Sequence, residues 1–157
     1  MARNYLQIGD MYKHLKNPQK YLSENKVITA RSGWEIQFIM KFLDRRSDVV
    51  NWSSEDFFIN YFYPVDGKVH RYFPDILMSV RTKEGKIVEH LIEIKPEAER
   101  FPPKVPKRQN KAYKERVNTF IKNQVKWKAA EAWCESERKK GRVIFFSVLT
   151  EKDFPFT

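Results

Sequence analysis

The sequence has few of the features that mark an oxidising compartment or a membrane. Its single cysteine, Cys134, cannot form an internal disulfide, which favours a reducing cytosol. Cys134 lies beside Trp133 in a helix-like stretch, and we interpret it as a small core residue rather than a nucleophile. The longest apolar run, Val143–Phe146, is far shorter than the roughly 20 residues of a membrane span. The N-terminal stretch MARNYLQIGDMYKH also lacks the apolar centre of a signal peptide.

Internal repeats and composition breaks are absent too, so nothing in the sequence demands a second domain. The 157 residues are 41% hydrophobic and 15% aromatic, which is a globular rather than a disordered composition. The sequence therefore predicts one main domain at residues 31–150. An arm with short helical pieces at 1–30 precedes this domain, and a short tail at 151–157 follows it.

Acidic residues are scarce in one part of the chain. Between Arg100 and Lys128 there are ten Lys or Arg residues and one acid, Glu115, whereas the remaining chain carries 20 basic and 19 acidic residues. Nearly all of the formal charge of +10 therefore lies in one block. A solvated charged face is one interpretation. A nucleic-acid backbone is the better partner, because phosphate contacts release counterions and give affinity without reading sequence.

The predicted elements alternate in an α/β order. Ser32 and Glu35 form a capping-box pattern that begins a helix, and the polar stretch 44–48 ends it. Strands are predicted at 57–63, 69–80 and 87–94, joined by turns at Asp66-Gly67 and 83–86. A long helix at 111–140 ends at Gly141, and a last strand follows at 142–149. The order is helix, three strands, helix, strand.

Strand alternation brings carboxylates together. Glu93 and Lys95 share one face of their strand, and Asp75 points away from the face of Tyr72 and Ile76. If the two strands are antiparallel neighbours, Asp75 lies beside Glu93, and two such carboxylates repel unless a cation lies between them. This arrangement suits Mg²⁺, with Lys95 placed to orient an attacking water. The alternative is that Glu93 and Lys95 form an ordinary exposed ion pair.

Other candidate residues have two interpretations each. Glu35 either completes the capping box or, because it shares a stripe with Phe38, points inward and joins a metal site. His70 either helps to handle protons or phosphate at the site, or is simply a hydrogen-bonded strand residue. Gln124 and Lys126 are either an ordinary polar helix face or a phosphate clamp.

Four blocks in order carry a family resemblance: RSGWE (31–35), VVNWSSE (49–55), YPVDGKVHRYFPD (63–75) and LIEIKPE (91–97). The PD at 74–75 and the EIK at 93–95 resemble the PD-(D/E)xK nuclease superfamily, which has the restriction-endonuclease-like fold. The four blocks together resemble the head completion nuclease family of T-even-type tailed phages. More distantly, they are similar to the endonuclease subunit of heteromeric transposases.

The resemblance implies a Mg²⁺-dependent DNA endonuclease, with Mn²⁺ as the alternative ion, that finishes the DNA-filled head before tail attachment. It implies a mixed central sheet flanked by helices, contacts with capsid or portal components, and a location in the virion and the host cytoplasm. It places the metal ligands at Glu35, Asp75 and Glu93, the catalytic lysine at Lys95, and an accessory polar residue at Gln124 or Lys126.

We therefore hypothesise that a metal-activated water hydrolyses DNA phosphodiesters. Seven basic residues are expected to grip the DNA backbone with low sequence specificity: Arg100, Lys104, Lys107, Arg108, Lys111, Lys114 and Arg116. Two alternatives stay open. One is a catalytically inactive DNA-binding protein that seals the filled head, and the other is a branched-DNA resolvase on the same fold.

Overall fold

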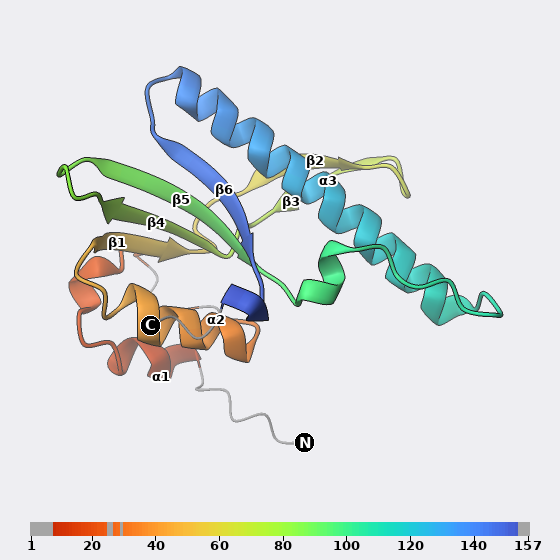
Figure 1. Cartoon of the computed structure of the whole chain (residues 1–157), viewed down its shortest axis with the longest axis horizontal. Coiled ribbons are helices and arrows are strands. Elements are labelled where there is room, and N and C mark those ends of the chain that lie inside the picture. The colour runs from red at the N-terminus through yellow and green to blue at the C-terminus, as the bar shows by residue number, and fades with distance from the viewer. Residues whose placement is uncertain (1–7, 25–26, 29, 154–157) are drawn as a thin grey trace.

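A four-stranded mixed sheet forms the centre of the molecule (Figure 1). The computed structural model describes residues 8–24, 27–28 and 30–153. The order of the strands in the sheet is β1-β4-β5-β6, with β1–β4 and β4–β5 antiparallel and β5–β6 parallel. The bounds of these strands are β1 Val49–Ser54, β4 Ile76–Arg81, β5 Ile87–Ile94 and β6 Ile144–Leu149. The expected α/β class with a mixed sheet and flanking helices is confirmed.

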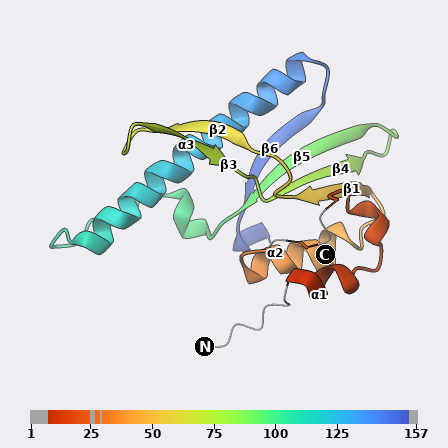
Figure 2. The same ribbon diagram turned by 180° about the vertical axis from the view of Figure 1, so that it is seen from behind.

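Helices cover both faces of this sheet (Figures 1 and 2). One face carries α1 (Ile8–Lys13), α2 (Gly33–Gln37) and the π-helix η2 (Phe38–Leu43). The long helix α3 (Lys111–Lys139) lies on the other face and contacts β6. The core is accordingly divided into two clusters of buried side chains, one on each face of the sheet.

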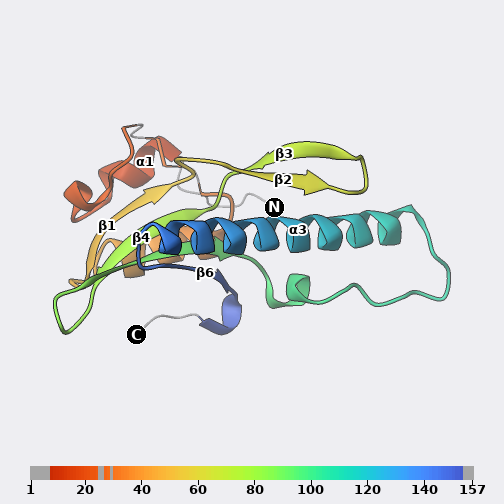
Figure 3. The same cartoon turned by 90° about the horizontal axis from the view of Figure 1, so that it is seen from above.

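The three strands expected before α3 are only partly the ones observed. Residues 57–63 were predicted as the first strand of the sheet, but β1 takes that place and was missed. Its sequence, VVNWSS, alternates poorly and ends in two serines, so it resembles a loop, yet Val49 and Trp52 are buried in the core. The segments β2 (Ile59–Tyr63) and β3 (Lys68–Tyr72) instead form a separate hairpin that contacts α3 (Figure 3).

The prediction of one continuous strand over 69–80 is wrong. Strand β3 ends at Tyr72 and β4 begins at Ile76, because Pro74 has no N–H to donate to a strand ladder. The break resets the alternation of side chains. Tyr72 therefore packs in the cluster on the α3 side, whereas Ile76 packs in the cluster on the α2 side.

The predicted starts of both helices are confirmed, but the first helix is a short α-helix followed by the π-helix η2. Ser32 caps α2, where its Oγ accepts the Glu35 N–H at 3.2 Å. Helix α3 ends one residue before its predicted last residue, and Gly141 follows with a φ of +103°, a conformation that favours glycine. The N–H groups of Gly141 and Arg142 donate to the carbonyls of Arg138 and Glu137, which is the Schellman arrangement.

The segment before α2 contributes to the core as well as containing helical turns. It forms α1 and the 3₁₀ turn η1 (Pro18–Lys20), and Met11 and Ile28 are fully buried. After β6, a 3₁₀ turn η4 covers Glu151–Asp153, and the rest of the predicted tail lies outside the described residues. No helix in the described ranges is long and apolar enough to cross a membrane. The division of the chain at residues 30 and 150 stays a prediction.

The parallel pairing of β5 and β6 fixes where polar side chains can gather. Strands β1, β5 and β6 all end at the same end of the sheet, and β4 begins there. The chain leaves this end after β5 through the 3₁₀ turn η3 (Glu97–Arg100), an extended loop at 101–110 and then α3. The end of the sheet where β5 stops is therefore also where the basic block starts.

Candidate active site

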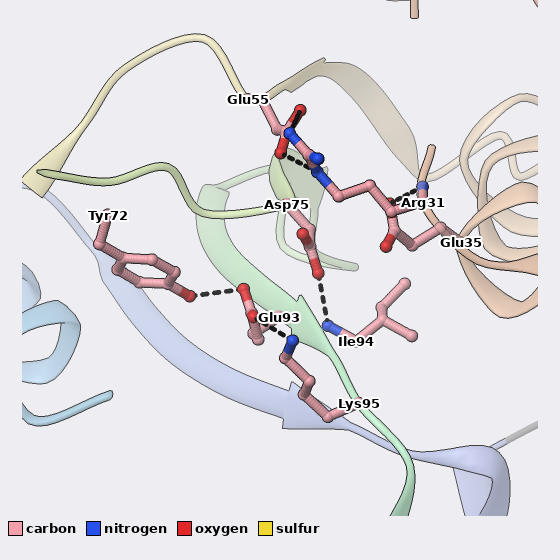
Figure 4. Close-up of polar contacts among 8 residues, drawn as sticks. All are labelled: Arg31, Glu35, Glu55, Tyr72, Asp75, Glu93, Ile94 and Lys95. Carbon is pink, nitrogen blue, oxygen red and sulfur yellow. Dashed lines mark hydrogen bonds and ion pairs between the residues drawn. The ribbon is translucent and has the colours of Figure 1, made fainter. Parts of the chain in front are cut away.

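Asp75 and Glu93 lie side by side at this end of the sheet (Figure 4). Ile76 pairs with Ile92, so Asp75, which precedes Ile76, lies opposite Glu93, which follows Ile92. The backbone N–H of Ile94 donates to Asp75 Oδ2 at 2.8 Å, which fixes the carboxylate against β5. Asp75 is 7% exposed and Glu93 is 3% exposed. The predicted neighbourhood of the two carboxylates is therefore present.

Glu93 is held between a phenol and an ammonium group. The Tyr72 hydroxyl donates to Glu93 Oε2 at 2.6 Å, and Lys95 Nζ lies 3.6 Å from Glu93 Oε1. The expected common face of Glu93 and Lys95 is confirmed by this ion pair. Tyr72 is a partner that side-chain alternation does not predict, because Pro74 ends that alternation and Tyr72 belongs to the separate β2–β3 hairpin.

Glu35 comes to the same region from the first turn of α2. Its Oε2 accepts the backbone N–H of Arg31 at 3.1 Å rather than that of Ser32, so the capping box is only half formed. The side chain is 6% exposed, which agrees with the inward direction predicted from its stripe. Glu35 thus serves the helix start and still lies near the other two acids.

Arg31 and Glu55 form the rim of the cluster, and neither was predicted as a site residue. Arg31 Nε lies 3.0 Å from Glu55 Oε1. Glu55 has a φ of +47°, and its N–H donates to the carbonyl of Asp75 at 3.2 Å. A non-glycine residue in this conformation is uncommon and marks a constrained turn beside the site. The pair depends on tertiary contact across 24 residues, so spacing alone could not reveal it.

Burial raises the pKa of all three acids, and neighbouring acidic charges add to this effect for Glu35 and Asp75. Burial raises the pKa of Glu35 from its ordinary 4.5 to about 7, and the charges of Glu55 and Glu93 act in the same direction. Burial, then the charges of Glu93 and Glu35, raise the pKa of Asp75 well above its usual range. Burial likewise raises the pKa of Glu93. A bound cation would relieve this concentration of negative charge.

Two lysines partly offset the acids. Burial opposes the charge of Lys95, but Glu93 and Asp75 outweigh it and raise the pKa of Lys95. Lys126, on α3, lies over the ring of Tyr72 at 5.3 Å from its centroid. Burial lowers the pKa of Lys126, and the charge of Glu93 acts against this. Lys126 therefore lies beside the acidic cluster, which is the position expected if it acts as a phosphate clamp.

The other two accessory candidates are not brought in. Gln124 is two residues from Lys126, which turns its side chain by about 200° around α3. His70 lies on the β2–β3 hairpin, where its Nε2 is 2.6 Å from Asp66 Oδ2. Its ring stacks on that of Tyr61. His70 therefore has the structural role that the sequence left open.

The donor set fits a hard divalent cation. Asp75 and Glu93 offer buried carboxylate oxygens, and Mg²⁺ takes one or two carboxylates and completes its shell with water and phosphate. Within the described ranges, no group of three His, Cys, Asp or Glu side chains is arranged to hold a metal ion. The structure thus provides a carboxylate pair, with Glu35 coupled to both members through its charge.

The basic block begins beside this cluster. The seven predicted DNA-binding residues all lie exposed in η3, the 101–110 loop or the first turns of α3. Figure 3 shows this loop and the N-terminal half of α3 projecting beyond the sheet. Arg100 and Lys111 have acidic neighbours in Glu97 and Glu115, at 3.8 and 4.0 Å. Such long, exposed contacts leave the cations available to phosphates.

Comparison with known proteins gives two matches. Residues 46–151 match the family described as the TnsA-like endonuclease N terminal domain, a range that includes Asp75, Glu93 and Lys95 but not Glu35. The chain is also similar to the head completion nuclease of Enterobacteria phage T4. That similarity is 41% identity over 140 residues, which cover 87% of each chain. No solved structure matches the chain significantly.

Proposed function

Because this chain belongs to the TnsA-like endonuclease family, we propose that it is a Mg²⁺-dependent DNA endonuclease that acts in phage head completion after packaging. The family match and the similarity to a head completion nuclease support a nuclease role in a phage. Mn²⁺ is the alternative ion. A virion component, either capsid or portal, is the proposed protein partner, with the protein acting in the host cytoplasm and remaining in the virion.

The observation that carries the proposal is the buried pair of carboxylates beside a lysine. Asp75 is anchored through Oδ2 by the Ile94 N–H, and Glu93 is anchored through Oε2 by the Tyr72 hydroxyl. Asp75 therefore keeps Oδ1 for a ligand, and Glu93 Oε1 has the 3.6 Å contact with Lys95. A structural ion pair would not need two buried acids whose pKa values are both raised.

The proposed roles follow from these positions. Asp75 and Glu93 hold the cation, and Glu35 reaches the same site from α2. Lys95, which is 3.6 Å from Glu93, positions the attacking water and offsets charge that develops on the phosphate. A bound Mg²⁺ would lower the pKa of water and stabilise the phosphate oxygens. The exposed cations of the basic block would hold the DNA backbone without reading bases, so sequence specificity is low.

Plasmid nicking tests this proposal. We expect the wild-type protein to nick supercoiled DNA with Mg²⁺ and not with EDTA. Glu93→Gln and Lys95→Ala should each slow nicking by about 100-fold or more, because they remove groups that act on the reacting atoms. The matched control is Glu89→Gln, which makes the same substitution on the same face of β5 but at the ion pair with Arg142. This control should retain activity.

Binding of the same plasmid, measured in EDTA, separates the proposal from its rival. A protein that binds DNA but never cuts supercoiled, linear or branched substrates with Mg²⁺ or Mn²⁺ would show the hydrolysis proposal to be wrong. That outcome would support a DNA-binding protein that seals the filled head. Equal activity of Glu93→Gln and Glu89→Gln would refute the assigned site while leaving nuclease activity possible elsewhere in the chain.

A further inference from the structure

A second concave site lies between the loop after β5 and the N-terminal half of α3. It is a cavity of about 600 Å³, within the size range of pockets that bind small organic groups. Phe101 and Pro103 line it from the loop, and Phe120 lines it from the helix. None of these three residues belongs to the acidic cluster. The cavity therefore has a largely apolar wall with aromatic rings on two sides.

Asn123 is a buried polar residue in the lining of this cavity. Its side chain is 4% exposed and lines the cavity. Its Nδ2 is buried and has no hydrogen-bond partner among the residues that the structure describes. A buried amide donor without a partner is costly, and native proteins rarely keep one without a reason. A rotation of the Asn123 side chain would turn this amide into the cavity, where a ligand that accepts a hydrogen bond would satisfy it.

Charged side chains surround the cavity. Lys104 and Arg116 line it and are exposed. Two acids, Glu99 and Glu115, line it as well, so the lining carries two charges of each sign. The wider surroundings are basic, because residues 100–128 contain ten Lys or Arg residues and one acid. This excess of positive charge favours a ligand that carries negative charge next to an apolar, polar-edged group.

The cavity adjoins the acidic cluster. Asn123 is three residues before Lys126 on α3, so the two side chains lie about one helical turn apart on the same side. Lys126 is the lysine on which the charge of Glu93 acts. On the other wall, Ala98 and Glu99 follow Lys95 by three and four residues in the chain. The cavity and the acidic cluster therefore share α3 and the segment that follows β5.

We propose that this cavity binds one unstacked nucleobase of the DNA that the enzyme cuts. Phe101 and Phe120 provide rings for stacking, and the Asn123 amide donates to an acceptor on the edge of the base. Lys104 and Arg116 contact the phosphates on either side. The inference rests on the proposed DNA endonuclease function and adds a substrate class to it. The enzyme prefers DNA in which a base near the cut is unpaired, because less unstacking is then required.

Binding in EDTA, where no cutting occurs, tests the cavity directly. Three duplexes of equal length are compared: one fully paired, one with a single extra unpaired adenine, and one with an extra abasic nucleotide at the same position. The wild-type protein should bind the adenine bulge roughly tenfold tighter than the abasic bulge, the size expected for stacking one base on an aromatic ring. The duplex with the abasic bulge bends as easily as the duplex with the adenine bulge, but it offers no base to the cavity.

Two variants and one control test whether the preference for the adenine bulge arises in this cavity. Asn123→Leu removes the amide without opening a hole, and Phe101→Ala removes an aromatic wall. Both should reduce the ratio of adenine-bulge to abasic-bulge affinity toward one. The control is Phe62→Ala on the β2–β3 hairpin, since Phe62 is 56% exposed and Phe101 is 59% exposed. This control should keep the wild-type ratio, and thermal unfolding checks that each variant folds.

The outcomes separate this inference from the proposed function. Equal wild-type affinity for the two bulges, or equal ratios for Phe101→Ala and Phe62→Ala, would overturn the nucleobase pocket. If that happens while Mg²⁺-dependent nicking persists, only the pocket is wrong. A retained preference for the adenine bulge without any nicking would support the pocket and refute hydrolysis.

Discussion

Glu35 should make the metal-free protein less stable as pH rises. In the folded state burial raises its pKa from 4.5 to about 7. The native protein then binds a proton that the unfolded chain has released, so stability falls with pH between these two values. The stability that Glu35 contributes is fully present below about pH 4.5 and is lost as pH rises through about 7. The difference between the folded and unfolded pKa values of Glu35 corresponds to about 3 kcal/mol of stability.

The substitution Glu35→Gln removes this titration, together with the part of the Asp75 shift in pKa that the Glu35 charge causes. Glutamine keeps an oxygen to accept the Arg31 N–H, but it does not titrate. Unfolding by urea in EDTA should show the variant gaining about 2 to 3 kcal/mol relative to the wild type between pH 5 and pH 8. In thermal unfolding this is a relative gain of about 5 to 10 °C for a chain of this size. His90, whose pKa burial lowers, titrates in both proteins and largely cancels in the difference.

Two controls accompany this measurement. Glu84→Gln, in the exposed turn between β4 and β5, should show no pH-dependent difference from the wild type. Adding Mg²⁺ at pH 8 should stabilise the wild type more than Glu35→Gln, because the cation binds the ionised folded state. A difference between wild type and Glu35→Gln that stays constant from pH 5 to pH 8 would refute the reasoning about burial.

Three further predictions concern other parts of the molecule. Tyr72→Phe should lower the free energy of unfolding in urea by about 2 kcal/mol, because it removes a buried donor to Glu93; an unchanged value would show that the hydrogen bond has no net effect. Lys107→Ala should reduce the slope of log affinity against log salt by about 0.9, the contribution of one duplex phosphate contact; an unchanged slope would remove Lys107 from the interface. Gly141→Ala should cost about 1 to 2 kcal/mol of stability, since alanine is strained at a φ of +103°, while nicking activity stays the same. A loss of nicking without loss of stability would contradict this last prediction.

Local patterns predicted most of the elements that position the site. The capping box located the start of α2, and the neighbouring positions of Asp75 and Glu93 followed from a short hairpin and side-chain alternation. These features depend on interactions within a few residues or across one turn. Sequence alone can therefore give them, and the same holds for the bounds of α3 and its terminating Gly141.

The features that were missed depend on long-range contact. Strand β1 is polar at Asn51 and Ser53, and it is a strand because β4 pairs with it. Tyr72 meets Glu93 only because Pro74 separates the hairpin from the sheet. The cavity next to Asn123 exists only because the loop after β5 folds back along α3. No spacing within the sequence encodes how far that loop returns.

The crossover between β5 and β6 has a consequence for how such enzymes diverge. Its two ends are fixed on neighbouring parallel strands, and it carries both the basic block and the walls of the cavity. Lengthening the 101–110 loop costs little stability, because each doubling of a flexible loop adds only about 0.6 kcal/mol. An insertion in this loop would therefore change the basic block and the cavity walls, while Asp75 and Glu93 stay in register on the sheet.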